Sequence, residues 1–295
     1  ECARRTIEFA NEMRKVDPNI ELVAVGCEDP EWNLEMIKNA GEYFDYLSVH
    51  IYIKGDKPYR ELAAVSMDIE RRLRNVYGLV QSARRKYGIK REIKLAFDEW
   101  NVWYPKAKAP LHEQVTSLRD AVLTGAVLNT LHRLCKAVPI GGFAQTVNVL
   151  PLIIALDDGR IVLTPQYLVF KLYGANTGDF VLRTAVDTDY YISNDLNEPV
   201  PFIDLSATIT EDRKTVYLHI VNRHETEFSE MEVSLRKFAP KEASHRYIAG
   251  KTVEDRNTLD NPENVKIEKA NVEIKKGKIL LDLPAHSVSV IKILG

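Results

Sequence analysis

Two adjacent carboxylates followed by aromatic side chains are the residues of this sequence best suited to chemistry. Asp98 and Glu99 end the apolar part of the stretch KLAFDEWNVWYP. Three aromatic residues come directly after them: Trp100, Trp103 and Tyr104. A carboxylate can act as a nucleophile or as a general acid or base, and aromatic faces beside polar groups suit sugar rings. The stretch is therefore a candidate carbohydrate site, while core or loop packing remains the simpler explanation of the aromatics.

The alternation of side chains along a strand predicts different surroundings for the two carboxylates. Glu99 is in phase with Phe97, and Asp98 is in phase with Ala96. Because neighbouring strand residues point to opposite faces, we expect that Asp98 and Glu99 cannot both face one site. One of them would then have a chemical role and the other a structural role. Alternation alone does not say which is which.

Polar residues also end two other short apolar runs. His50 and Tyr52 lie two positions apart at the end of YLSVHIY, which places both on one face of a strand, and Gln145 ends GGFAQ. In a parallel α/β domain, ligands bind at the carboxyl ends of the strands. These side chains are therefore candidates for the same site as the carboxylate pair.

A retaining glycoside hydrolase needs two carboxyl groups about 5 to 5.5 Å apart, and Glu99 could be one of them. The pair Asn11-Glu12 looks like a candidate for the other, because an Asn-Glu pair is a common setting for a glycosidase acid/base. However, Glu12 lies off the apolar stripe of its predicted helix and does not end a strand. We therefore expect Glu12 to be a solvated surface charge.

Several other kinds of site lack their sequence patterns. The seven histidines show no HExxH or HxH spacing, and the chain has neither GxGxxG nor GxxxxGK[ST]. None of the expected strands ends in the lysine that a Schiff-base aldolase would need. Cys27 ends the run IELVAVGC, where a small buried thiol is a simpler interpretation than a nucleophile. We expect no metal and no cofactor.

Composition argues for an ordinary soluble protein. The 40 basic residues nearly balance the 42 acidic ones, which argues against nucleic acid or an anionic membrane as a partner. No apolar run approaches the ~18 residues that span a bilayer. Three widely spaced cysteines without a CxxC motif are typical of reduced thiols, so a cytoplasmic location is expected.

The elements that must position these residues form two halves. Strands separated by helices predict an α/β half with parallel pairing, and we expect its strands over 20–26, 43–52, 93–100 and 141–147 and its helices over 29–40, 66–87 and 113–137. Beyond about residue 174, alternating runs over 214–222, 271–284 and 286–294 predict an all-β domain, a sandwich. The predicted domains are residues 1–178 and 179–295.

The stretch FDEWNVWY resembles glycoside hydrolase family 51, the intracellular α-L-arabinofuranosidases. Four further stretches carry the resemblance in the same order: VDPNIELVAVGCEDPEWN, YLSVHIY, FAQTVNVL and RNTLDNPENV. The resemblance implies a (β/α)8 TIM barrel followed by a jelly-roll-like β-sandwich, and a retaining, exo-acting enzyme that releases terminal arabinofuranosyl residues.

The resemblance also implies roles for individual residues. Glu99 matches the nucleophile of the family. Tyr52 matches the tyrosine that hydrogen-bonds near that nucleophile, and Gln145 matches a glutamine that contacts the arabinose. Trp103 matches the aromatic that lines the leaving-group side, and His50 is assigned to the pocket. Asp98 is then the structural carboxylate. The indoles of the stretch become an expected sugar-binding wall.

The family pattern departs from this sequence at one point. The acid/base of the family is a Glu that ends the fourth barrel strand, and residues 1–18 correspond to the helix after that strand. The sequence also opens within an amphipathic helix and without an initiator Met. We therefore expect the second half of the barrel, with the N-terminal half supplied by the same protein or by a separate chain.

Other functions stay open at this stage. The expected partners are an arabinofuranosyl oligosaccharide and the other barrel half, with a homo-oligomer also expected from the resemblance. A β-xylosidase or endoglucanase of the same architecture is the nearest alternative. A non-catalytic sugar-binding fragment is an alternative from a different class, because one carboxylate without a partner can bind a sugar but cannot cleave it.

Overall fold

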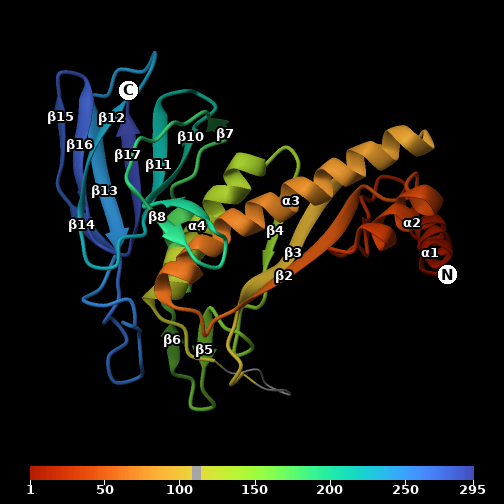
Figure 1. The fold of residues 1–295 in the computed structure, drawn as a ribbon, viewed down its shortest axis with the longest axis horizontal. Helices are drawn as coiled ribbons and strands as arrows, with labels where there is room; N and C mark the ends of the chain where they lie inside the picture. The colour runs from red at the N-terminus through yellow and green to blue at the C-terminus, as the bar shows by residue number, and fades with distance from the viewer. Residues whose placement is uncertain (108–113) are drawn as a thin grey trace. The chain divides into compact units, whose positions relative to one another are not determined.

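A computed structural model describes residues 1–107 and 114–295. By its internal contacts the chain divides into two compact units (Figure 1). The first, here the sheet unit, comprises Glu1–Ile53, Asp68–Asn101 and Leu134–Ala144. The second, here the sandwich unit, comprises Lys54–Met67, Val102–Arg133 and Gln145–Gly295. The domain boundary expected between residues 178 and 179 stays a prediction.

A four-stranded sheet forms the centre of the sheet unit. Its strands lie in the order β1 (Val23–Ala24), β2 (Tyr46–Lys54), β3 (Lys94–Trp103) and β4 (Ile140–Phe143). β1 pairs with β2 and β3 pairs with β4 in parallel, so the α/β class expected for this half is confirmed. β4 ends before the predicted strand does, which places Gln145 beyond the strand rather than on it.

The described ranges of the chain contain five helices: α1 (Cys2–Val16), α2 (Pro30–Ala40), α3 (Tyr59–Tyr87), α4 (Leu118–Leu134) and α5 (Pro165–Gly174). The predicted start of α2 is confirmed, because the Asp29 side chain accepts the backbone N–H of Glu31. α3 begins earlier than the predicted residue 66, and the predicted start of α4 at Glu113 lies outside the described residues. Within the described ranges, none of the helices is long and apolar enough to span a bilayer.

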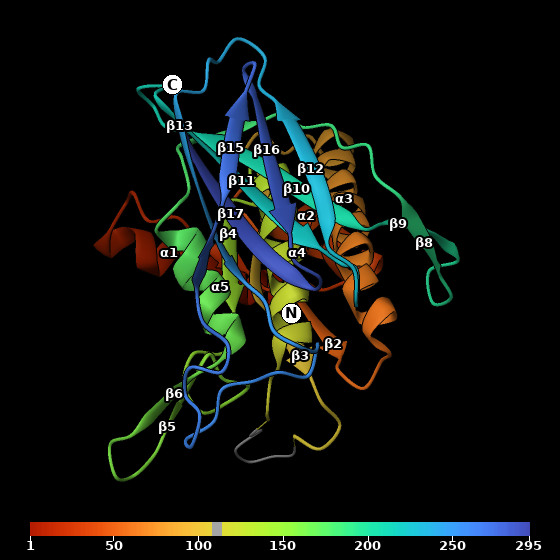
Figure 2. The ribbon, with the colours of Figure 1, turned by 90° about the vertical axis from the view of Figure 1, so that its left-hand side faces the viewer.

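Two antiparallel sheets pack on each other in the sandwich unit, as Figure 2 shows. The larger sheet has the order β14 (Glu268–Ala270), β13 (Glu242–Ile248), β17 (Ser287–Leu294), β11 (Thr215–Asn222), β10 (Ile203–Ile209) and β7 (Phe180–Leu182). The smaller sheet has the order β12 (Ser229–Ser234), β16 (Lys278–Leu283) and β15 (Val272–Lys275). One hydrophobic cluster contains Leu218 and Ile291 from the first sheet and Ile279 and Leu281 from the second. The expected all-β region after the α/β half is confirmed.

Short hairpins complete the unit. Two small sheets consist of β5 (Ile153–Ala155) with β6 (Ile161–Leu163) and of β8 (Tyr190–Ser193) with β9 (Glu198–Pro201). The alternating run over 271–284 is a hairpin of β15 and β16 rather than one strand. Lys276 and Gly277 between them have φ angles of 51° and 77°. Positive φ at two central residues is typical of a two-residue hairpin turn, so the chain reverses there.

The other face of the six-stranded sheet packs against helices α4 and α5. Leu118 and Val122 of α4 and Leu172 of α5 share a buried cluster with Val221 and Val288 of the sheet. The larger sheet therefore has apolar side chains on both of its faces. This explains why the strands β11 and β17 contain nearly continuous buried runs rather than a simple alternation of buried and exposed residues.

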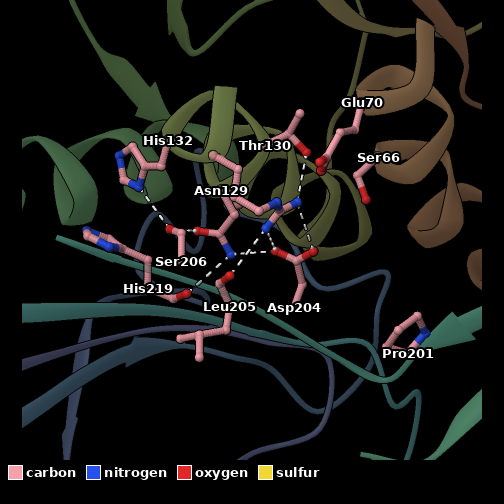
Figure 3. Close-up of polar contacts among 12 residues, drawn as sticks. Ser66, Glu70, Asn129, Thr130, His132, Pro201, Asp204, Leu205, Ser206 and His219 are labelled. Carbon is pink, nitrogen blue, oxygen red and sulfur yellow. Dashed lines mark hydrogen bonds and ion pairs between the residues drawn. The ribbon is translucent and has the colours of Figure 1, made fainter. Parts of the chain in front are cut away.

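A polar layer lies between α4 and the sheet (Figure 3). The Asn129 side chain accepts a hydrogen bond from the Ser206 hydroxyl at 2.7 Å and donates to Asp204 at 2.7 Å. His132 Nδ1 lies 2.9 Å from the same hydroxyl. His219 Nε2 donates to the backbone carbonyl of Asn176 at 2.9 Å, which makes Nε2 the protonated nitrogen of that ring.

The two histidines of this layer resist protonation. Burial, with a smaller contribution from the neighbouring Arg133 guanidinium, lowers the pKa of His132 from 6.5 to about 4. Burial and then the adjacent His132 ring lower the pKa of His219 from 6.5 to about 3. Both imidazoles are therefore neutral at neutral pH and below it, which matches their packing against Tyr173 with ring centroids 5.9 and 4.6 Å away.

We expect stability to fall on acidification, partly through these rings. Below pH 6.5 an unfolded histidine binds a proton that His132 in the fold does not bind until about pH 4, so unfolding is favoured as the pH drops through that window. His132→Asn keeps a side-chain amide beside Ser206 but cannot be protonated. The urea concentration at the midpoint of unfolding should therefore fall less between pH 7 and pH 4.5 in this variant than in the wild type. An equal fall in both proteins would contradict the lowered pKa of His132 in the folded state.

Candidate active site

One face of strand β2 carries three polar side chains in succession. Ser48, His50 and Tyr52 lie at alternate positions of the strand, so their side chains point to the same side. Ser48 is buried, at 6% exposed, whereas the side chain of His50 is 46% exposed. The common face expected for His50 and Tyr52 is present, and both side chains reach strand β3.

Both His50 and Tyr52 contact the same oxygen of Glu99. The Tyr52 hydroxyl donates to Glu99 Oε2 at 2.9 Å, and His50 Nδ1 lies 3.3 Å from that oxygen. Burial, together with the hydrogen bond to Glu99, raises the pKa of Tyr52 to about 12, so the phenol stays protonated and remains a donor. In the described part of the chain, the polar contacts of the Glu99 side chain fall on Oε2, which leaves Oε1 without such a contact.

Asp98 faces the same histidine as Glu99. Its Oδ1 accepts a hydrogen bond from the Ser48 hydroxyl at 2.8 Å and lies 3.5 Å from His50 Nε2. His50 thus stands between the two carboxylates, with one ring nitrogen toward each. The expectation that Asp98 and Glu99 cannot both face one site is therefore wrong.

An irregularity in the pairing of β3 with β4 explains the failure of the alternation rule. Phe97 pairs with Gly141 and Trp100 pairs with Phe143, so the two carboxylates stand opposite the single residue Gly142. Such a bulge inserts an extra residue into one strand and redirects its side chains. A Cβ at Gly142 would lie 2.6 Å from the carbonyl oxygen of Asp98, so only glycine allows this close approach.

Trp100 is part of the core and does not form a sugar-binding surface. It is 2% exposed, stacks on Phe97 with ring centroids 6.0 Å apart, and meets the edge of Phe143 at 5.1 Å. The expectation that all the indoles of the stretch line a sugar site is therefore wrong for Trp100. The cause is the bulge: the strand resumes its pleat after Glu99 and turns the next side chain inward.

Two of the predicted site residues belong to the sandwich unit. Trp103 is 36% exposed, and its indole N–H donates to the backbone carbonyl of Ala107 at 2.9 Å. Gln145 is exposed and follows the end of β4. Their predicted contacts to a sugar stay predictions. The sheet unit by itself brings together Glu99, Tyr52 and His50 from the predicted set.

Sequence reasoning missed Ser48 and correctly set Glu12 aside. Ser48 shares the strand face of His50 and Tyr52 at a spacing of two, and this period was the signal that could have identified it. Glu12 lies on α1 with its side chain 69% exposed and forms an ion pair with Lys15 at 2.6 Å. Among the described residues, no group of three or more His, Cys, Asp or Glu could hold a metal ion.

The arrangement in the sheet unit is suited to nucleophilic catalysis by a carboxylate. Glu99 Oε2 is held by a phenol and lies beside an imidazole, and the side chain is 43% exposed. Glu99 does not end its strand as predicted, because β3 continues to Trp103. A carboxylate held at one oxygen has a defined direction of attack through the other, so little orientation has to be gained in the reaction.

Comparison with known proteins gives a consistent result. The family model described as "Alpha-L-arabinofuranosidase C-terminal domain" matches residues 98–287. An intracellular exo-alpha-(1->5)-L-arabinofuranosidase of Halalkalibacterium halodurans is 30% identical over an alignment of 259 residues that covers 81% of this chain and 51% of that protein. The α-L-arabinofuranosidase of Thermotoga maritima, crystallised as an arabinose complex, superposes with a TM-score of 0.88 at 31% identity, over 100% of this chain and 62% of the other.

A second solved structure is equally similar. The family 51 α-L-arabinofuranosidase of Thermotoga petrophila superposes with a TM-score of 0.87 at 31% identity, over 98% of this chain and 61% of the other. The chain thus spans about half the length of the curated relative named above and about three fifths of the solved structures.

Proposed function

The chain belongs to glycoside hydrolase family 51, the α-L-arabinofuranosidases, and from this we propose that its protein releases terminal arabinofuranosyl residues by a retaining mechanism with Glu99 as the nucleophile. The observation that carries the proposal is the position of Glu99 on β3 of the parallel sheet, with Oε2 bound to Tyr52 and Oε1 free in the described part of the chain. The names of the relatives support arabinofuranosides as substrates and a cytoplasmic location.

The proposed reaction has two displacement steps. Glu99 Oε1 forms a bond to the anomeric carbon while the glycosidic bond breaks, and an acid/base carboxyl gives its proton to the departing oxygen. That carboxyl, now a base, then takes a proton from water, whose oxygen displaces Glu99 from the same carbon. Tyr52 keeps Oε2 hydrogen-bonded throughout, so it helps to stabilise the carboxylate that leaves in the second step.

The acid/base must lie about 5 to 5.5 Å from the nucleophile in a retaining enzyme. Glu12 does not qualify, since it is an exposed helical side chain paired with Lys15. We propose that the acid/base comes from the part of the relatives' length that this chain does not match. The four parallel strands would then be the second half of a (β/α)8 barrel, followed by a jelly-roll-like sandwich.

Three further residues complete the proposal. Gln145 would hydrogen-bond the arabinose, and Trp103 would contact the leaving group with its partly exposed indole. Asp98 would act through His50 and Ser48 rather than on the sugar, because its Oδ1 already contacts both.

The proposal is tested by a substrate panel with the full-length protein. We expect hydrolysis of an aryl α-L-arabinofuranoside at a kcat/KM at least about tenfold above that for an aryl β-xyloside, and no release of sugar from cellulose; tenfold corresponds to ~1.4 kcal/mol in the transition state. A product with retained anomeric configuration would support double displacement. Preference for the xyloside or for cellulose would overturn the substrate assignment, and binding of arabinose without turnover would favour a sugar-binding role.

A further inference from the structure

Strand β3 continues beyond the last residue that pairs with β4. That pairing runs as far as Trp100, whereas β3 extends to Trp103. On one side of the strand, the carbonyl of Trp103 accepts the backbone N–H of Gly55 at 3.1 Å. Neighbouring residues of a strand direct their backbone groups to opposite sides, so those of Val102 and Tyr104 point away from Gly55 and need other partners.

The side chain of Gln114 bonds to both of these neighbours. Its Nε2 donates to the Val102 carbonyl at 2.8 Å, and its Oε1 accepts the Tyr104 backbone N–H at 3.1 Å. In a parallel ladder, a residue of the partner strand makes the same two bonds, one before and one after the residue that it faces. The amide of Gln114 therefore takes the place of a partner-strand residue opposite Trp103.

The chemistry and the burial of Gln114 both suit this place. A carbonyl can only accept and an N–H can only donate, and a planar amide offers a donor and an acceptor side by side. Gln114 is 9% exposed and Val102 is 2% exposed, so water has little access to the Val102 carbonyl. A buried polar group without a partner is costly, so the end of β3 depends on this side chain.

The same backbone determines the direction of the Trp103 indole. The indole N–H donates to the Ala107 carbonyl at 2.9 Å, and the Ala107 N–H donates to the Tyr104 carbonyl at 2.9 Å. The Tyr104 hydroxyl donates to the buried Asp120 at 2.9 Å. The indole is thus bound to a turn that begins at Tyr104, the residue whose backbone N–H is held by Gln114.

We propose that Gln114 is a positioning residue for the leaving-group side of this site: its amide holds β3 at Val102 and Tyr104 and thereby orients the Trp103 indole. The inference about substrates rests on the proposed function, in which Trp103 contacts the leaving group, whereas the support of the backbone does not. The effect of Gln114 should then depend on the leaving group, because a small one offers little surface to an indole.

Kinetics of Gln114→Met in the full-length protein test the functional part. The change keeps the length of the side chain and removes both hydrogen bonds. We expect kcat/KM for an aryl α-L-arabinofuranoside to fall about tenfold, and kcat/KM for methyl α-L-arabinofuranoside to fall less than about twofold. Gln114→Glu is a second variant: its carboxylate keeps an acceptor for Tyr104 but cannot donate to Val102, and its loss should also be larger for the aryl substrate.

Two controls show whether Gln114 acts through the indole. In a Trp103→Ala background, Gln114→Met should change kcat/KM for the aryl substrate by less than about twofold, because residues that act as a unit are not additive. Gln166→Met is the matched control, since Gln166 is a glutamine of the sandwich unit, 1% exposed, that donates to the Thr124 hydroxyl at 3.0 Å. It should change kcat/KM for both substrates by the same factor.

Amide hydrogen exchange measured by mass spectrometry tests the backbone without reference to activity. We expect the Tyr104 amide to exchange at least about tenfold faster in Gln114→Met than in the wild type, because its N–H loses the acceptor. Peptides that contain Tyr104 should exchange as in the wild type in Gln166→Met.

The two readouts separate the possible failures. Unchanged exchange at Tyr104 in Gln114→Met would overturn the supporting role, whatever the kinetics. Faster exchange with equal losses for the two substrates, or with no loss, would overturn the positioning role for the leaving group. Faster exchange in a protein that does not hydrolyse arabinofuranosides would remove the proposed function and leave the support of β3 standing.

Discussion

Replacing Glu99 with glutamine should lower kcat on an aryl α-L-arabinofuranoside by at least about 10⁴-fold, because an amide cannot form the glycosyl ester that the proposed mechanism requires. The side chain keeps its size and can still accept the Tyr52 hydrogen bond, so the fold and the affinity for arabinose should change little. Initial rates together with a melting curve of the purified variant measure both expectations.

The chain offers a matched control for this substitution. Glu12→Gln makes the same chemical change at a helical residue that is 69% exposed and forms an ion pair with Lys15 on its own helix. We expect its kcat to stay within twofold of the wild type. Near-normal turnover by Glu99→Gln, or a large loss in Glu12→Gln, would show that the nucleophile has been misassigned.

The largest effect on stability is expected at Arg223, whose side chain is 1% exposed in the sandwich unit. Its guanidinium lies 3.0 Å from Asp204 Oδ2 and also donates to Ser66 at 2.9 Å and to the carbonyl of Pro201 at 2.9 Å. Burial by itself would raise the pKa of Asp204, but the guanidinium groups of Arg223 and Arg133 outweigh it and lower that pKa. Asp204 is therefore a buried carboxylate that depends on its cationic partners.

Arg223→Met should lower the free energy of unfolding by about 3 to 5 kcal/mol, because it leaves a buried carboxylate with too little compensating charge. Urea unfolding at pH 7 measures the loss. Lys278→Met is the control: it removes the cation of an exposed pair with Glu232, in which the two side chains are 49% and 52% exposed. The control should cost less than about 1 kcal/mol. Equal losses in the two variants would contradict the role of the buried pair.

Local sequence pattern predicted the elements of both halves well, because it depends on interactions between residues close in the chain. The cap at Asp29 and the helix end at Gly88, whose φ is 71°, follow from backbone preferences that need no tertiary contact. The strand that carries His50 and Tyr52 was likewise recognisable from its composition. The earlier start of α3 was not recognisable from the sequence, because its beginning is stabilised by burial of Leu62 and Ala63 in the core.

The candidate site was partly predictable for the same reason. A run of apolar residues followed by polar ones predicted strand ends, and this pattern identified Glu99, His50 and Tyr52, although β2 continues to Lys54 and β3 to Trp103. Ser48 was overlooked, although its spacing from His50 is also two. Its hydrogen bond to Asp98, which lies on another strand, became visible only in the structure.

The sequence by itself determined that this chain has an α/β half and an all-β half, and that a strand carries two carboxylates beside aromatic residues. Only the tertiary structure decided how Asp98, Glu99 and Trp100 divide between site and core. That division depends on the pairing of β3 with β4, where one residue of β4 faces two of β3. The alternation of a strand is a local property, whereas a bulge is set by the partner strand, and here by a glycine far along the chain.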